Sequence, residues 1–147
     1  TNLQPSIPLA QELETVRNYL ALEQLRFEQR LRVHEQVDRA AEPLLVPPFL
    51  LQTLVENAVK FGVGSRREGG EVKYEVMLCD AILLLRVTNS GRLGAKSEST
   101  GLGLANARAR LLHLFGPEAS LTLAQASADL VVAEARIPVP VSISPST

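Results

Sequence analysis

Apolar residues recur at three- and four-residue intervals near the start of the chain. The positions that share this spacing are Leu9, Leu13, Val16, Leu20, Phe27 and Leu31, and Glu23 interrupts the stripe. This period predicts an amphipathic helix of about six turns. Ser6 and Pro8 are residue types that favour a helix start. A short strand is expected to follow over residues 32–38, with Val33 and Val37 on one face.

A second apolar stripe begins after a proline-rich stretch. Pro43, Pro47 and Pro48 precede a predicted helix over residues 49–61, which glycines end. Successive residues turn by about 100° around a helix, so apolar and polar side chains can separate onto opposite faces. The apolar face carries Leu51, Leu54, Val55 and Ala58, and the polar face carries Thr53, Glu56, Asn57 and Lys60. The apolar face is expected to pack on the core.

The rest of the chain alternates between strand-like and helical patterns. Strands are predicted over residues 72–78 and 82–88, joined by a tight turn at 80–81. A loop over 89–100 leads to a helix over 103–115, and two further strands over 121–124 and 130–137 form a hairpin. This order predicts an α/β two-layer sandwich, a mixed and mostly antiparallel sheet with helices on one face. A groove is expected between the second and third helices.

Composition narrows the class of protein. The chain has 147 residues, of which 46% are apolar and 21% charged, the balance of one globular domain. A net charge of -1 and 4% aromatic residues argue against a nucleic-acid partner. Cys79 is the only cysteine, and the longest apolar runs, such as residues 82–85, are too short to cross a bilayer. The sequence begins at Thr1, so we expect a piece of a longer protein.

The polar face of the second helix has two interpretations. An amide oxygen from Asn57 can ligate Mg²⁺, and Lys60 one turn later can meet phosphate oxygens. Alternatively, Glu56 and Lys60 form an i,i+4 ion pair on a solvated surface. The helix alone favours the ion pair.

Two short glycine-containing segments also allow a binding role. Gly101 and Gly103 are expected at the mouth of the third helix, where backbone N–H groups can approach a polyanion. Asn89 follows an apolar strand and precedes Gly91, a position from which an amide can hydrogen-bond a base. Each segment alone is equally compatible with an ordinary turn.

The order of these segments resembles a known family. Residues 54–62 resemble the N box of histidine-kinase ATP-binding domains, residues 87–91 their first glycine box, and residues 100–104 their second. These boxes belong to the superfamily of gyrase, chaperone, histidine-kinase and mismatch-repair ATPases, whose core is the Bergerat (GHKL) fold. Residues 48–52 and 103–111, with the first helix, are most similar to LytS-type sensor histidine kinases. The resemblance spans about residues 9–138.

The resemblance implies ATP and Mg²⁺ as cofactors and a role for each matching residue. Asn57 would be the metal ligand, and Glu56 and Lys60 the catalytic residues. The nucleotide-binding residues would be Asn57, Lys60, Asn89, Gly91, Thr100, Gly101, Leu102, Gly103 and Leu104. Residues 92–100 would form a short lid over the nucleotide. The implied function is to supply the γ-phosphoryl group of ATP to a histidine outside this chain.

The chain departs from the family pattern at four positions. Asn89 replaces an aspartate, and Leu93 stands where the second glycine of its box is expected. Phe61 replaces a residue that is often histidine or tyrosine, and Thr53 cannot act as a carboxylate base. These departures keep two alternatives open: a degenerate nucleotide-binding interaction module, or a serine kinase or ATPase of the same superfamily.

The resemblance also implies how the chain fits into a longer protein. Residues 1–31 would be a linker helix from a phosphoacceptor segment, residues 32–138 the ATP-binding domain, and residues 139–147 a loose tail. The expected partners are that helical segment of the parent chain and a response regulator. The parent is expected to be a membrane-attached homodimer with this domain in the cytoplasm. Arg108, predicted on the apolar face of the third helix, would need an acidic or carbonyl partner. This position favours a structural clamp, and the family resemblance also allows a catalytic role.

Overall fold

The computed structural model describes residues 6–64, 66–93 and 98–139, without the side chains of residues 98–102. Its helices are α1 (Leu9–Phe27), α2 (Leu50–Gly62) and α3 (Glu98–Phe115), with short 3-10 helices at Glu28–Arg30 and Arg39–Ala41. Its strands are β1 (Ile7–Pro8), β2 (Leu31–Val37), β3 (Leu45–Val46), β4 (Gly70–Cys79), β5 (Ile82–Ser90), β6 (Ser120–Ser127) and β7 (Leu130–Pro138). None of the described helices is both long and apolar enough to span a membrane.

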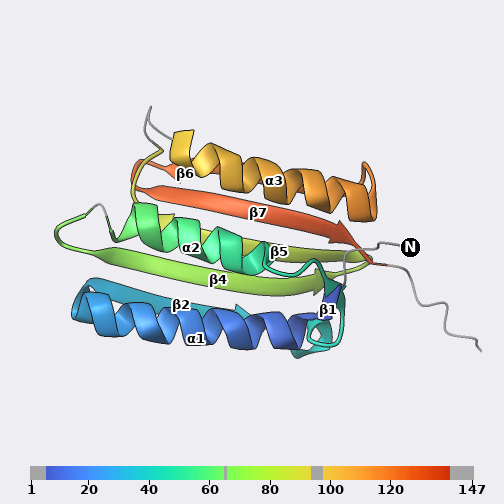
Figure 1. Ribbon diagram of the computed structural model, residues 1–147, viewed down its shortest axis with the longest axis horizontal. Helices are drawn as coiled ribbons and strands as arrows, with labels where there is room; N and C mark the ends of the chain where they lie inside the picture. Colours follow the sequence, from blue (N-terminus) through green and yellow to red (C-terminus); the bar gives the residue numbers. More distant parts are fainter. Residues whose placement is uncertain (1–5, 65, 94–97, 140–147) are drawn as a thin grey trace, which may run out of the picture.

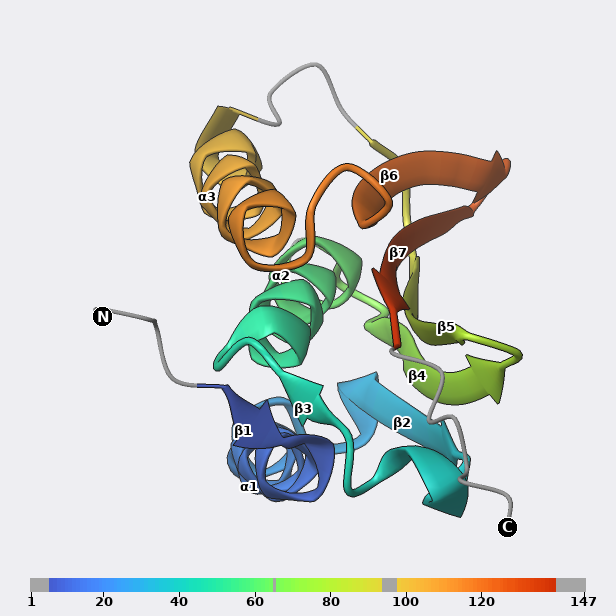
Figure 2. The same ribbon diagram turned by 90° about the vertical axis from the view of Figure 1, so that its right-hand side faces the viewer.

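The main sheet has five strands in the order β2-β4-β5-β7-β6. β2 runs parallel to β4, and the other neighbouring strands are antiparallel. Figures 1 and 2 show α1, α2 and α3 side by side on one face of this sheet, with α2 in the middle. The predicted two-layer sandwich with a mixed, mostly antiparallel sheet is therefore confirmed.

The core fills the space between the helices and the sheet. Alternate residues of β4 and β5 point inward, and the buried ones are Val72, Tyr74, Val76, Leu83, Leu85 and Val87. From the helical layer, the predicted apolar face of α2 and the first four positions of the α1 stripe are buried against them. The hydrophobic period therefore identified the core face of both helices correctly.

The structure differs from the predictions at two helix ends. The first helix stops at Phe27, and Leu31, predicted as its last apolar position, instead begins β2 beside Gly70. The chain turns at Glu28, whose φ of 55° lies in the left-handed region and ends the α-helix. The third helix begins at Glu98 rather than near residue 103. A glycine inside a helix costs only about 1 kcal/mol relative to alanine, so the glycines there do not delay its start.

Glu35 of β2 links α1 to the sheet, because it bonds both to Arg17 of α1 and to the buried Tyr74 of β4. Arg17 of α1 donates from Nε and Nη2 to the two carboxylate oxygens of Glu35, each at 2.9 Å. The hydroxyl of Tyr74 donates to the same carboxylate. The Arg17 hydrogen bonds, with help from Tyr74, lower the pKa of Glu35 despite its partial burial. Burial and the bond to Glu35 in turn raise the pKa of Tyr74.

We expect this cluster to make the free energy of unfolding of the domain decrease at acidic pH. Because the pKa of Glu35 is lower in the folded state, its contribution is complete above its ordinary value of 4.5 and is lost as the pH falls through the folded value. Urea unfolding of the unmodified chain and of Glu35→Gln, measured between about pH 7 and pH 3, should show curves that converge in acid. A Glu14→Gln variant, altered at an exposed site on α1, is the control. Parallel curves for Glu35→Gln and the unmodified chain would contradict the role of Glu35.

Candidate functional site

The polar face of α2 is the centre of the candidate site. Glu56 and Lys60 are exposed on this face, while Thr53 and Asn57 are partly buried. On the opposite face Leu51, Leu54, Val55 and Ala58 are all buried, with at most 3% of the surface of each exposed. The predicted separation of the two faces is confirmed. The sheet therefore fixes one side of α2 and leaves the other side free to meet a ligand.

A carboxylate from α1 caps the start of α2. The Glu12 carboxylate, only 1% exposed, accepts hydrogen bonds from the backbone nitrogens of Phe49 (3.0 Å) and Gln52 (3.1 Å). Phe49 has a φ of 69°, a strained conformation for a bulky residue, and its own side chain provides no cap. A negative charge at a helix N-terminus also interacts favourably with the helix dipole. Glu12 therefore fixes where α2 begins.

Glu56 and Lys60 have separate partners. Glu56 accepts a hydrogen bond from Nε2 of Gln52 at 2.8 Å. The Lys60 ammonium lies over the Phe61 ring, 5.3 Å from its centroid. The i,i+4 ion pair between Glu56 and Lys60 does not form, so the surface ion-pair interpretation is wrong. Among the described residues, Lys60 has no carboxylate partner, which leaves its charge available to an anion.

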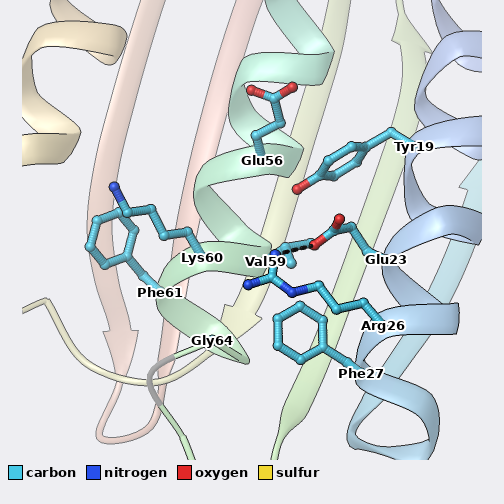
Figure 3. A pocket seen from close by; sticks show the side chains of 9 residues that line it. All are labelled: Tyr19, Glu23, Arg26, Phe27, Glu56, Val59, Lys60, Phe61 and Gly64. Atoms are coloured by element: carbon cyan, nitrogen blue, oxygen red, sulfur yellow. Dashed lines mark ion pairs between the residues drawn. The ribbon is translucent and has the colours of Figure 1, made fainter.

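A cleft of about 570 Å³ lies between α1 and α2, beside Glu56 and Lys60. It is lined by Tyr19, Glu23, Arg26, Phe27, Glu56, Val59, Lys60, Phe61 and Gly64. Figure 3 shows Glu56 and Tyr19 on facing helices, with Lys60 extending toward Phe61 and away from α1. Burial, with the charges of Glu23 and Glu56, raises the pKa of Tyr19 to about 12. The groove predicted between α2 and α3 stays a prediction.

The end of β5 meets the end of α2 at Asn89. This residue is 7% exposed, and its Nδ2 donates to the carbonyl oxygen of Ser90 at 2.8 Å. A Cβ atom at Gly62 would lie 2.8 Å from the Cβ of Asn89, so only glycine permits this approach. Gly91 has a φ of 129°, and a Cβ there would lie 3.3 Å from the carbonyl oxygen of Phe61. The fold therefore brings residues 54–62 close to residues 87–91, although the two segments are far apart along the chain.

Comparison with known proteins agrees with this geometry. No family model matches the chain. The LytS sensor protein of Bacillus subtilis is 36% identical over 128 residues, which are 78% of this chain and 22% of that protein. The sensor histidine kinase/phosphatase LytS of Staphylococcus aureus is 36% identical over 132 residues, 80% of this chain and 23% of that protein. The chain belongs with the LytS-type sensor histidine kinases.

Solved structures support the same fold. The catalytic domain of the histidine kinase ThkA superposes with a TM-score of 0.69 at 19% identity, and the match covers 91% of this chain and 94% of that one. The LytS-type chain therefore has the fold of a histidine-kinase catalytic domain over nearly its whole described length. It spans only about a fifth of the LytS proteins that it matches.

Asn57 has a feature that suits the metal-ligand role predicted for the LytS-type domain. Its Nδ2 atom is buried without a hydrogen-bond partner among the described residues. A buried polar atom left unpaired is unfavourable, and such atoms in native folds often accompany a bound ion, a water or a catalytic role. The Nδ2 donor is therefore not committed to a structural hydrogen bond, and the oxygen of the same amide is the kind of ligand that Mg²⁺ accepts.

Residues 100–104, predicted as the second glycine box, lie within α3. Thr100, Gly101 and Leu102 have side-chain positions outside the described set. Leu104 is 5% exposed and packs in the core, while a Cβ at Gly103 would meet no described atom within 4 Å. Because the helix begins at Glu98, Gly101 lies in its first turn and Gly103 lies in its second turn, rather than both at its first residues. Packing among the described residues does not require glycine at position 103.

Arg108 is exposed rather than buried on the apolar face of α3. Its Nε donates to the carbonyl oxygen of Leu121 in β6 at 2.9 Å. The predicted burial is therefore wrong, and the predicted carbonyl partner is confirmed. Arg108 therefore links α3 to β6, an edge strand of the sheet.

Sequence reasoning missed the roles of two residues whose hydrogen bonds support the candidate site, Glu12 and Gln125. Glu12 stands directly beside Leu13 of the apolar stripe, and a carboxylate so close to the buried face was the available signal. Gln125 of β6 forms hydrogen bonds with the backbone of Gly91 and Leu93, and no local sequence pattern predicts these bonds. Both act on residues more than thirty positions away.

Proposed function

We propose that this chain binds ATP with Mg²⁺ and supplies the γ-phosphoryl group to a histidine outside it. The observation that carries the proposal is the meeting of α2 with the end of β5, which places the Asn57 helix beside Asn89 and Gly91. The similarity to LytS proteins along 78% of the chain supports the same conclusion. Chemistry of this kind needs positioning and charge neutralisation from the protein rather than covalent catalysis.

Each residue of the site has a proposed role. Asn57 holds Mg²⁺ through its amide oxygen, and the Lys60 ammonium neutralises phosphate charge after leaving the Phe61 ring. Asn89 accepts a hydrogen bond from the adenine amino group, because its oxygen can do so without the charge of an aspartate. Gly91 lets backbone approach the base. Thr100, Gly101, Leu102, Gly103 and Leu104 are proposed to surround the phosphates.

Glu56 is proposed to face the acceptor histidine. Its carboxylate lines the cleft between α1 and α2, and Gln52 holds one oxygen. A carboxylate in hydrogen-bond reach of an imidazole N–H would orient the ring and stabilise positive charge that develops on it. The acceptor would therefore approach α2 from the α1 side, with the nucleotide on the side of Asn89.

The setting of the domain in a longer protein is part of the proposal. ShkA, whose fold is similar, was solved in complex with AMPPNP, and ThkA in complex with the response regulator TrrA. By analogy we propose a response regulator and a helical phosphoacceptor segment as partners. The parent would be a membrane-attached homodimer with this domain in the cytoplasm. Residues 1–31 would connect the acceptor to the ATP-binding domain over 32–138, and residues 139–147 would be a tail.

One observation favours a second candidate function, that of a nucleotide-binding module without kinase activity. Asn89 lacks the charge of the usual aspartate, and its Nδ2 is already bonded to Ser90. Calorimetric titration of the chain with ATP, with and without Mg²⁺, tests binding. Phosphoryl transfer to an added acceptor segment from a LytS protein then distinguishes the kinase from the module. The absence of heat on ATP addition would overturn both functions.

Asn57→Ala is expected to weaken ATP binding by about tenfold or more when Mg²⁺ is present, and much less in its absence. The reason is that the amide oxygen acts on the nucleotide through the cation. Calorimetry in Mg²⁺ and in EDTA measures the difference. Asn18→Ala, at an exposed position on α1, is the matched control and should bind as the unmodified chain does. An equal loss in both buffers would show that Asn57 is no metal ligand.

A further inference from the structure

The segment that follows β5 is held by one side chain from a distant strand. Gln125 of β6 accepts a hydrogen bond from the backbone nitrogen of Leu93 through Oε1, at 2.7 Å. Its Nε2 donates to the carbonyl oxygen of Gly91 at 3.0 Å. The same amide therefore bonds to both ends of residues 91–93, which Ser90 separates from Asn89, the residue proposed to bind adenine.

The Gln125 amide is fully engaged by backbone groups. Besides Gly91, its Nε2 approaches the carbonyl oxygens of Ser127 at 2.8 Å and Leu130 at 3.1 Å. Two amide hydrogens are thus shared among three acceptors. Since every neighbour of Nε2 is an acceptor and the neighbour of Oε1 is a donor, the orientation of the amide is fixed by its partners. Gln125 is exposed, yet its rotamer is determined.

The backbone of the β6–β7 hairpin is irregular where Gln125 stands. The ladder pairs Gln125 with Val131 but Ser127 with Leu130, so the register shifts between these pairs. A bulge bends its strand and re-aims side chains, and bulges are frequent beside functional sites. Gln125 stands at this irregularity, and its amide reaches the segment that follows β5.

The hairpin turn makes two further contacts with the same segment. The backbone nitrogen of Gly91 donates to the carbonyl oxygen of Asp129 at 2.8 Å. Nε of Arg92 donates to the carbonyl oxygen of Ala128 at 3.1 Å. Each residue from 91 to 93 is therefore tied to the β6–β7 hairpin, and Gln125 supplies the only described side chain of the hairpin in these bonds.

We infer that Gln125 is a positioning residue for the nucleotide site, which sets residues 91–93 and through them the base-reading amide of Asn89. The inference rests on the proposed function. Asn89 bonds to Ser90, and Gly91 lies close to the carbonyl of Phe61, so a shift at Gly91 displaces the contact between β5 and α2. Gln125 does not touch the nucleotide itself.

The test compares the unmodified chain with Gln125→Met, which keeps the length of the side chain and removes both its donor and its acceptor. Gln36→Met, at an exposed position on the opposite edge strand, is the control. Three quantities are measured on each protein: the amide hydrogen-exchange rate of Leu93, the affinities for ATP and GTP, and the midpoint of thermal unfolding.

Gln125→Met is expected to speed exchange at Leu93 by about tenfold or more, because its N–H loses its acceptor. ATP affinity should fall by about tenfold, which corresponds to roughly one lost hydrogen bond. The preference for ATP over GTP should shrink, since the base-reading amide is loosened. The control should match the unmodified chain in all three measurements.

The possible failures are distinguishable. If the unmodified chain binds ATP in preference to GTP and Gln125→Met does so equally well, the inference is overturned and the proposed function stands. If affinities for ATP and GTP fall by the same factor together with the unfolding midpoint, Gln125 has a general structural role and the inference is overturned. If the unmodified chain binds neither nucleotide, the proposed function is overturned, and the inference, which rests on it, is overturned as well.

Discussion

Glu12→Ala is expected to lower the free energy of unfolding by about 3–5 kcal/mol. The substitution leaves the backbone nitrogens of Phe49 and Gln52 buried without their acceptor. It also removes the negative charge from the start of α2 and opens a cavity where a side chain 1% exposed had been. Urea unfolding at neutral pH, followed by circular dichroism, measures the loss.

Two variants separate the causes of this loss. Glu12→Gln keeps the volume and one oxygen, so we expect about half the destabilisation of alanine. Glu14→Ala changes an exposed glutamate on the same helix and should stay within about 0.5 kcal/mol of the unmodified chain. If Glu12→Ala proves no more destabilising than Glu14→Ala, the capping role of Glu12 is refuted.

Asn89→Leu is expected to weaken ATP binding by about thirtyfold or more and to abolish the preference for ATP over GTP. Leucine offers the adenine amino group no acceptor, so that group would be desolvated without a partner. Asn89→Asp should tighten ATP binding or leave it unchanged, since a carboxylate is the stronger acceptor. Calorimetric titrations with both nucleotides provide the affinities.

The Asn89 variants need a folding control because the residue touches Gly62. Leucine adds bulk where the two elements approach closely, so the unfolding midpoint of each variant must be measured alongside its affinity. Thr88→Val, at the neighbouring residue of β5, whose side chain lies on the other face of the strand, is a matched comparison that should leave nucleotide preference unchanged. If Asn89→Leu is folded and binds ATP as tightly as the unmodified chain, the base lies elsewhere.

The sequence predicted the elements in which periodicity and packing agree. In α2 the apolar and polar sets fall on opposite faces, and burial follows that division. In β4 the alternation of apolar residues matches the side that faces the helices, whereas β5 begins with a continuous apolar run in which Leu83, Leu84 and Leu85 are all buried. These patterns work because one face of each element must leave water, which imposes a period of 3.6 or 2 on the residues.

Long-range polar contacts could not be predicted in this way. The partners of Glu12 and Gln125 are backbone groups far along the chain, and backbone groups have no sequence signature. The pairing of Glu56 with Lys60 failed for a related reason, since i,i+4 spacing allows an ion pair but the Phe61 ring and Gln52 offered each residue another partner. Weak surface interactions of this kind compete within a fraction of a kcal/mol.

The place of α1 in the fold limits where the protein can be divided. Its helix contributes four fully or nearly buried apolar residues, the cap of α2 and the arginine that bonds to Glu35. A truncated protein starting at Leu31 would lose all three contributions and expose the apolar side of β2 and α2 to water. Such a truncation is expected to aggregate during expression, so junctions for fusion proteins or domain exchanges belong before Ile7.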